Sequence, residues 1–83
     1  MEEVETALQI IKNQTGLTLE PDTYFPGIKE HLGKKYFNVE MDTPVFCATE
    51  YNRLLAYASK YKTISVEPNG YKRLAIFINN KII

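Results

Sequence analysis

Cysteine and histidine are the side chains most often used as nucleophiles, general bases and soft metal ligands, and this chain has one of each, Cys47 and His31. A structural zinc site needs roughly four such ligands, so these two do not make one. A cysteine–histidine nucleophile pair is formally possible. However, Cys47 stands in the apolar run 45–48, where a thiol usually serves as inert packing. His31 follows Lys29 and Glu30 in a polar stretch, and we expect a solvated surface histidine.

Carboxylates and glycines are too dispersed to define a catalytic or phosphate-binding motif. Glu40, Asp42, Glu50 and Glu67 could meet after folding, but nothing in their spacing selects a pair for acid–base chemistry. The glycines never cluster, so the sequence has neither a P-loop nor a dinucleotide-binding fingerprint. We therefore expect a protein that is not an enzyme and that has no cofactor and no metal site.

Aromatic and basic residues near the end of the chain give one hint of binding. Tyr71 and Arg73 are two residues apart on a predicted strand, so they share one face of the sheet. An exposed sheet face with such side chains can stack single-stranded bases. The glycines that accompany this pattern in four-stranded RNA-binding sheets are missing here. The simpler alternative is ordinary cross-strand packing, with Tyr71 opposite Glu67 and Arg73 opposite Ser65.

A second candidate surface lies on the later predicted helix, where Arg53 and Tyr57 are one turn apart, just off the apolar stripe. Arginine and tyrosine are enriched in protein–protein hot spots, because they bury a large area and carry a polar group. Surface tyrosines are also common without any function. An exposed edge strand is a third route, since a partner or a second copy of the chain can add to it.

The charge balance argues more for a protein partner than for nucleic acid. The 83 residues hold ten basic and ten acidic side chains, and 45% are apolar, as in an ordinary folded domain. Residues 1–33 have two basic and six acidic side chains, whereas residues 34–83 have eight basic and four acidic ones. This asymmetry is modest, and packing of the two halves would mix the charges, so nucleic acid is possible but not favoured.

The sequence also indicates a compartment. No apolar run approaches the roughly 18 residues of a membrane span, and the chain starts with an acidic stretch where a signal peptide would be basic. The single cysteine cannot form an internal disulfide, which suits a reducing compartment. We expect a cytoplasmic protein that does not contact a membrane.

The first half of the chain predicts one helix and leaves the segment after it open. Residues 2–14 have an apolar stripe of helical spacing, and Gly16 is suited to end the helix. Residues 17–20 could form a short strand. Within residues 24–34, a helical turn at 28–32 is slightly favoured over a strand, since apolar and polar residues alternate there as well.

The middle of the chain predicts two strands and a helix. Residues 35–41 alternate apolar and polar side chains, which is typical of a half-buried strand. Residues 45–48 are predicted as a strand, because extending the next helix back over them would leave Val45 and Phe46 off its apolar stripe. The helix itself is predicted over 50–61, capped by Thr49. Its stripe comprises Tyr51, Leu54, Leu55, Ala58 and Tyr61.

The end of the chain predicts a β-hairpin with strands 63–67 and 71–78 around Pro68-Asn69-Gly70. A three-residue loop pairs Ile64 with Leu74 and Val66 with Lys72, with Gly70 in a left-handed bulge. This loop brings the apolar side chains of both strands to one face, whereas a two-residue turn would not. The tail 79–83 either extends the last strand or docks on the sheet.

Together these elements predict a single α+β domain over residues 1–83, in which two helices pack on one face of a mainly antiparallel sheet that ends in a β-hairpin. The expected function is that of a small non-catalytic binding or adaptor domain that contacts another protein. The alternative is weak binding of single-stranded nucleic acid through the sheet face that carries Tyr71 and Arg73.

Overall fold

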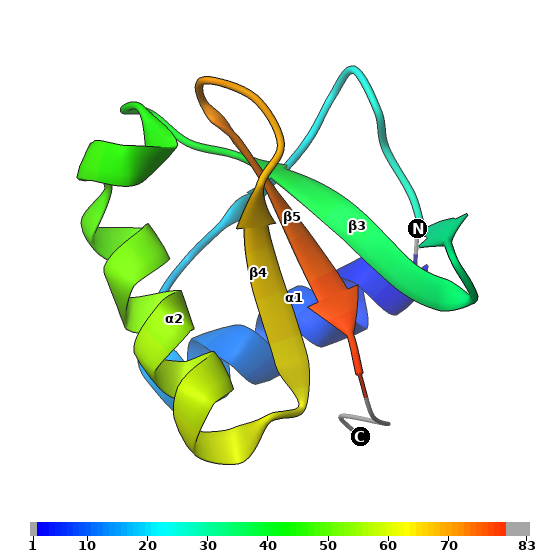
Figure 1. The fold of residues 1–83 in the computed structure, drawn as a ribbon, viewed down its shortest axis with the longest axis horizontal. Helices are drawn as coiled ribbons and strands as arrows, with labels where there is room; N and C mark the ends of the chain where they lie inside the picture. The colour runs from blue at the N-terminus through cyan, green and yellow to red at the C-terminus, as the bar shows by residue number, and fades with distance from the viewer. Residues whose placement is uncertain (1, 80–83) are drawn as a thin grey trace.

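A five-stranded antiparallel sheet forms the centre of the computed structural model, which describes residues 2–79 (Figure 1). The strand order is β1-β3-β5-β4, and β2 pairs with a further part of β3. Two helices complete the domain, so the predicted α+β class is confirmed. In chain order the elements are α1 (Glu2–Thr15), β1 (Glu20–Pro21), β2 (Lys29–His31), β3 (Lys34–Glu40), the 3-10 turn η1 (Val45–Cys47), α2 (Thr49–Tyr61), β4 (Ile64–Pro68) and β5 (Arg73–Ile78).

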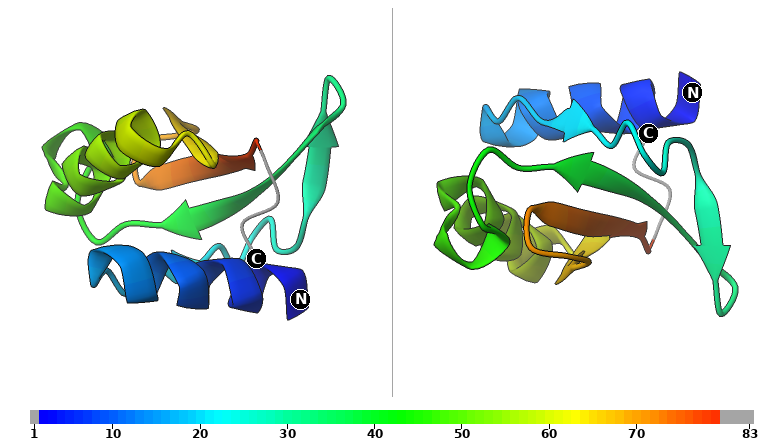
Figure 2. Two further views of the ribbon diagram at one scale, coloured as in Figure 1. Left: turned by 90° about the horizontal axis from the view of Figure 1, so that it is seen from below. Right: turned by 90° about the horizontal axis from the view of Figure 1, so that it is seen from above.

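The register of the central strands places their apolar side chains on one face. Phe37 lies opposite Ile76, and Val39 lies opposite Leu74. Because directly paired residues point to the same side of a sheet, this face carries the core. The helix α1 lies behind the strands and α2 lies beside β4 (Figures 1 and 2). Both helices share one core with the sheet: Val4, Ala7, Ile11, Leu17, Leu19, Phe37, Val39, Met41, Val45, Ala48, Leu54, Ile64, Val66, Leu74 and Ile76.

The first helix forms as predicted, with one residue more at its end. Its apolar stripe is buried, and the N–H of Gly16 donates to the carbonyl of Lys12 at 2.8 Å. Gly16 has φ +77°, the left-handed conformation that ends helices and that glycine adopts most readily. Strand β1 starts at Glu20, so it covers only the end of the 17–20 segment predicted as a strand.

The prediction of a helical turn at 28–32 is wrong, because Lys29–His31 is strand β2. Leu32 and Gly33 have φ +51° and +80°, and two positive φ values define the two-residue turn that joins tightly paired strands. The turn pairs His31 with Lys34 and Lys29 with Tyr36. β3 therefore supplies β2 with backbone hydrogen-bond partners, which an isolated helical turn of this length would largely lack.

The prediction of a strand at 45–48 is also wrong, since this segment forms the 3-10 turn η1. The N–H of Cys47 donates to the carbonyl of Pro44, and the N–H of Ala48 donates to that of Val45, at 2.9 and 3.1 Å. Val45 and Ala48 are three residues apart, so one 3-10 turn directs both into the core. The prediction assumed that every apolar residue here is buried, but Phe46 is 76% exposed.

Helix α2 matches its predicted extent to within one residue. It begins at Thr49, which does not cap it, because the N-cap position is Ala48 and no side-chain cap hydrogen bond forms. Leu54, a residue of the predicted stripe, is fully buried. Leu55 and Tyr61, at the margins of that stripe, stay 39% and 51% exposed.

The final hairpin has the predicted faces but a different register. Ile64 pairs with Ile78 rather than Leu74, and Val66 pairs with Ile76 rather than Lys72. Alternation of apolar residues determines only which residues share a face, and a shift by an even number of residues preserves that face. The predicted three-residue loop is wrong because Pro68 pairs with Leu74 as the last residue of β4.

Two further expectations change with this register. Tyr71 lies in the loop and β5 begins at Arg73, so the strand predicted over 71–78 is shorter. The cross-strand partner of Glu67 is Ala75 rather than Tyr71, and that of Ser65 is Phe77 rather than Arg73. Gly70 has a positive φ, +137°, within the longer loop.

The tail 79–83 was expected to extend the last strand or to dock on the sheet. Residues 80–83 of this tail lie outside the described residues. Asn79 continues the ladder, since its N–H donates to the carbonyl of Thr63 at 3.0 Å. Neither helix within residues 2–79 has the length and apolar character needed to cross a lipid bilayer.

The turn between β2 and β3 provides a test of this hairpin. Leu32 has a left-handed backbone and is 90% exposed, which combines backbone strain with an unburied apolar side chain. We expect Leu32→Asn to raise the free energy of unfolding by about 1 kcal/mol, because asparagine tolerates this conformation. We expect Gly33→Ala to lower it by about 1 kcal/mol. Urea denaturation measures the free energy of unfolding of both variants. Equal effects of the two substitutions would contradict the left-handed turn at Leu32 and Gly33.

Candidate functional site

The two residues singled out for nucleophilic or metal chemistry belong to elements at opposite sides of the domain, β2 and η1 (Figure 1). His31 is exposed on β2, as expected, whereas Cys47 is exposed on η1 instead of packing in the core. Among residues 2–79, no three or more histidine, cysteine, aspartate or glutamate side chains gather in a way that could hold a metal ion.

An ion pair joins Asp22 to Arg73 on the side of the sheet away from the core. Arg73 donates a hydrogen bond from Nε to Oδ2 of Asp22, whose side chain is fully buried. The N–H groups of Tyr24 and Phe25 donate to Oδ1 of the same carboxylate, at 2.8 and 3.3 Å. The N–H of Asp22 donates to the carbonyl of Asn38 at 3.1 Å. Asp22 therefore fastens the loop after β1 onto the sheet.

This environment lowers the pKa of Asp22 below its ordinary value of 3.8. Burial acts in the opposite direction and raises the pKa, because it disfavours the charged form. The hydrogen bonds from Tyr24, Arg73 and Phe25, together with the positive charge of Arg73, outweigh that effect. The carboxylate is thus ionised and paired in the folded protein at neutral pH.

The loop after β1 also covers part of Arg73, which leaves less of this side chain available to a binding surface. The guanidinium carbon of Arg73 lies 4.8 Å from the centre of the Phe25 ring, and its side chain is 27% exposed. The carboxylate takes the Nε–H donor and the ring lies against the guanidinium, so less of Arg73 is open to a ligand than the sequence predicts. Thr23 strengthens the cover, since its N–H and hydroxyl both donate to Glu40, at 2.9 and 2.8 Å.

Tyr71, predicted to share a face with Arg73, lies in the loop before β5 and is 76% exposed. Its carbonyl accepts a hydrogen bond from the N–H of Val45 at 3.0 Å, which sets the loop beside η1. Phe46, the next residue of η1, is also 76% exposed, and its ring meets that of Tyr51 edge to face at 6.2 Å. We call these three residues, Phe46, Tyr51 and Tyr71, the aromatic patch.

The other predicted pair, Arg53 and Tyr57, lies on α2. Arg53 is exposed, and Tyr57 is partly buried against the core. The ring of Tyr57 contacts that of Tyr61, with centroids 4.9 Å apart. Much of the Tyr57 side chain is therefore used within the domain.

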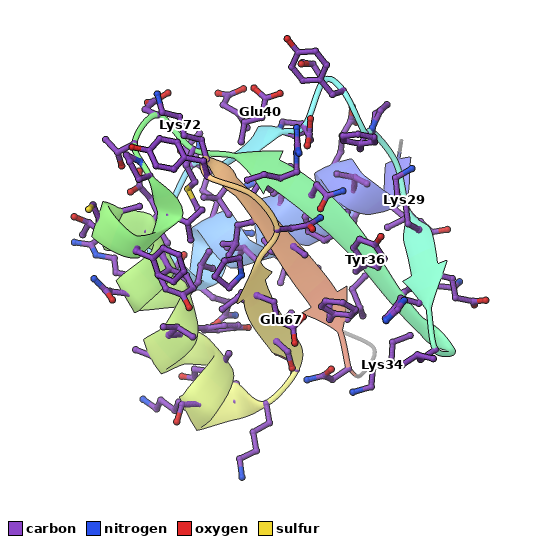
Figure 3. The ribbon with its side chains drawn as sticks, turned by 45° about the horizontal axis from the view of Figure 1, so that its top comes forward. Lys29, Lys34, Tyr36, Glu40, Glu67 and Lys72 are labelled. Carbon is purple, nitrogen blue, oxygen red and sulfur yellow. The ribbon has the colours of Figure 1, made fainter. Side chains whose placement is uncertain are left out.

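The uncovered part of the sheet carries a second group of aromatic and basic side chains. Tyr36 and Phe77 are direct cross-strand partners, and their rings stack with centroids 4.9 Å apart and planes 28° apart. Lys29 pairs with Tyr36 across β2 and β3, and Lys34 is on the same face (Figure 3). We call these four residues the stacking face. Beside it is a hollow of about 190 Å³, lined by His31, Tyr36, Glu67, Pro68, Asn69, Ala75 and Phe77.

Sequence reasoning missed Phe46 as a surface residue and did not single out Tyr36 or Asp22 as site residues. Phe46 was assigned to the core because the segment was predicted as a strand. Tyr36 had a usable signal, since it alternates with the buried residues of β3 and so had to face away from the core. Asp22 gave no local signal, because its partner Arg73 is 51 residues away.

Removing the buried carboxylate tests the role of the Asp22–Arg73 contact. We expect Asp22→Asn to lower the free energy of unfolding by about 2 kcal/mol at pH 7, because Arg73 loses its ionic partner. Folding lowers the pKa of Asp22, so this stabilisation is present above pH 3.8 and is lost as the pH falls through the lower folded-state value. The difference between wild type and variant should therefore shrink towards pH 2.

Urea denaturation at pH 7, 4 and 2 measures this difference. Asp42→Asn, at an exposed position after β3, is the matched control and should change the stability little at any pH. A loss of stability in Asp22→Asn that stays the same across this pH range would contradict the assignment.

No family model matches the chain, and the comparisons with curated proteins and with solved structures find no significant similarity.

Proposed function

We propose that this domain is a non-catalytic binding or adaptor domain that contacts another protein through the aromatic patch. The observation that carries the proposal is the exposure of Phe46 and Tyr71, whose side chains are each 76% exposed. The backbone hydrogen bond from Val45 to Tyr71 holds their two segments side by side. Burying one such ring removes on the order of 100 Å² of apolar surface from water, which is worth about 2.5 kcal/mol. Aromatic side chains that present this much area are typical anchors of protein interfaces.

The backbone beneath the patch supports this proposal. Val45 is fully buried, so η1 is anchored in the core next to Phe46. The N–H groups of Met41, directly after β3, and of Val45, in η1, donate to the carbonyls of Lys72 and Tyr71, at 2.7 and 3.0 Å, and hold both segments against the loop before β5. Side chains on a backbone held in this way lose little conformational freedom on binding, which favours affinity.

We also propose that the protein acts in the cytoplasm. Cys47 is the single cysteine of the chain and is exposed on η1, beside the patch. An exposed thiol next to a binding surface is kept unmodified most easily in a reducing compartment.

The proposal is tested with the purified domain as bait in a nuclease-treated lysate of its source. Captured polypeptides are identified by mass spectrometry, and the binding of each purified candidate is then measured by calorimetry. We expect the double variant Phe46→Ser/Tyr71→Ser to weaken binding by at least about 2 kcal/mol, because it removes both exposed rings. Its fold is expected to persist, since both side chains are outside the core.

The matched control is Tyr61→Ser, which removes an aromatic ring that is 51% exposed at the far end of α2. This variant should bind as the wild type does. Arg53→Ala and Tyr57→Ala test the α2 surface in the same assay. A partner that binds the double variant as tightly as the wild type would contradict the patch as the interface.

Binding of single-stranded nucleic acid is the second candidate function, and the stacked rings of Tyr36 and Phe77 favour it. Each base that stacks on an aromatic side chain contributes about 1–3 kcal/mol, and lysines beside the rings attract phosphates. For this function we propose the stacking face as the nucleic-acid-binding surface instead of Tyr71 and Arg73. Arg73 is already paired with Asp22 and packed against the ring of Phe25.

Fluorescence anisotropy with a labelled single-stranded oligonucleotide tests this alternative at low and high salt. If it holds, Tyr36→Ala weakens binding by about 1–3 kcal/mol, and added salt weakens it further. Tyr24→Ala, which removes a 78% exposed ring from the loop after β1, is the control. The absence of any binding at low salt would exclude the alternative.

A further inference from the structure

The outer edge of β4 presents backbone N–H and C=O groups at defined residues. In the β4–β5 ladder the N–H of Asn79 donates to the carbonyl of Thr63, and the N–H of Asn69 donates to that of Arg73. Hydrogen-bonded pairs alternate along an antiparallel ladder, so residues 63, 65, 67 and 69 direct their N–H and C=O groups towards β5. Ile64 and Val66 must direct theirs away from β5, to the outer edge.

No strand within residues 2–79 covers that edge, because β4 is the last strand of the sheet and pairs with β5 alone. Figure 1 shows β4 with α1 behind it and α2 to one side. A hollow runs between the edge and α2, with Leu55 and Ala58 on the helix side and Ile64 and Val66 on the strand side. The opposite edge of the sheet is formed by short strands, and β2 there consists of charged or polar residues, which discourage pairing.

We propose that a second copy of this chain adds its own β4 antiparallel to this edge, which forms a two-fold symmetric dimer with one continuous sheet. Ile64 of each copy then lies opposite Val66 of the other. Both residues direct an N–H and a carbonyl towards the outer edge, so the two strands exchange about four backbone hydrogen bonds. This surface is separate from the aromatic patch, so the inference goes beyond the proposed function.

The residues at each end of β4 select this register. A dimer centred on Val66 would pair Ile64 with Pro68, which has no N–H to donate. A dimer centred on Ile64 would pair Val66 with Lys62, whose φ of +58° is not that of a strand. Only the register centred on Ser65 uses two residues in each copy that have both backbone groups and extended geometry.

Charge and shape support the same arrangement. The register sets Glu67 of one copy opposite Thr63 and next to Lys62 of the other, and two-fold symmetry repeats this contact. The symmetry axis is perpendicular to the sheet, so both α2 helices lie on the same face of the continuous sheet. The 39% exposed Leu55 and the small residues Ala58 and Ser59 then face the other copy across the hollow, which allows a close approach of the helices.

Light scattering and amide hydrogen exchange, each measured as a function of concentration, test the proposal. The contact is small, so we expect a micromolar to millimolar dissociation constant, with the mass rising from 9.6 kDa to twice that value between about 1 µM and 1 mM. The amides of Ile64 and Val66 should exchange quickly in dilute solution and become at least about tenfold slower at high concentration. The amides of Ser65 and Glu67 are internal controls, because β5 already protects them.

Two helix variants separate this contact from any other self-association. Leu55→Glu should raise the dissociation constant by more than about tenfold, because the carboxylate would be desolvated without a partner. Ala56→Glu adds the same charge at the next position, outside the hollow, and should leave dimerisation unchanged. A mass that stays at 9.6 kDa over the whole concentration range overturns the proposal, and a peptide of another protein then becomes the candidate occupant of the edge. A dimer that Leu55→Glu does not weaken, or that forms without protecting Ile64 and Val66, overturns it as well.

Discussion

The pairing of β3 with β5 is the constraint on which the rest of the structure depends. It sets Phe37 against Ile76 and Val39 against Leu74, and so decides which side of the sheet becomes the core. Both helices pack against that side because their apolar stripes have no other surface to cover. The same pairing puts Glu40 next to Arg73 on the other side, where the loop after β1 is fastened through Asp22 and Thr23.

Features of the fold with a local cause were predictable from sequence. The helices follow from apolar spacing, and the shared face of Ile64, Val66, Leu74 and Ile76 follows from alternation along two strands. Features that depend on distant partners were not predictable. The strand β2 exists because β3 pairs with it, and the register of β4 on β5 differs from the prediction by an even shift that alternation does not detect.

The candidate surfaces show the same division. Tyr71 is exposed, but in a loop rather than on the strand face where it was predicted. Phe46 was expected in the core, because the prediction required every apolar residue to be buried. Arg73 was expected to be open to a ligand, whereas a carboxylate 51 residues away holds it in place. A small domain has more apolar residues than its core can enclose, and those left outside are the natural candidates for binding.

The proposed interface with another protein consists of Phe46, Tyr51 and Tyr71. Nuclear magnetic resonance of the ¹⁵N-labelled domain, titrated with a partner identified by capture, locates the contacted residues one by one. We expect the largest chemical-shift changes to be confined to the amides of residues 45–51 and 70–72, while the amide signals of β3 and of Phe77 do not move. Shift changes centred on Tyr36 and Phe77, with the aromatic patch unaffected, would contradict it.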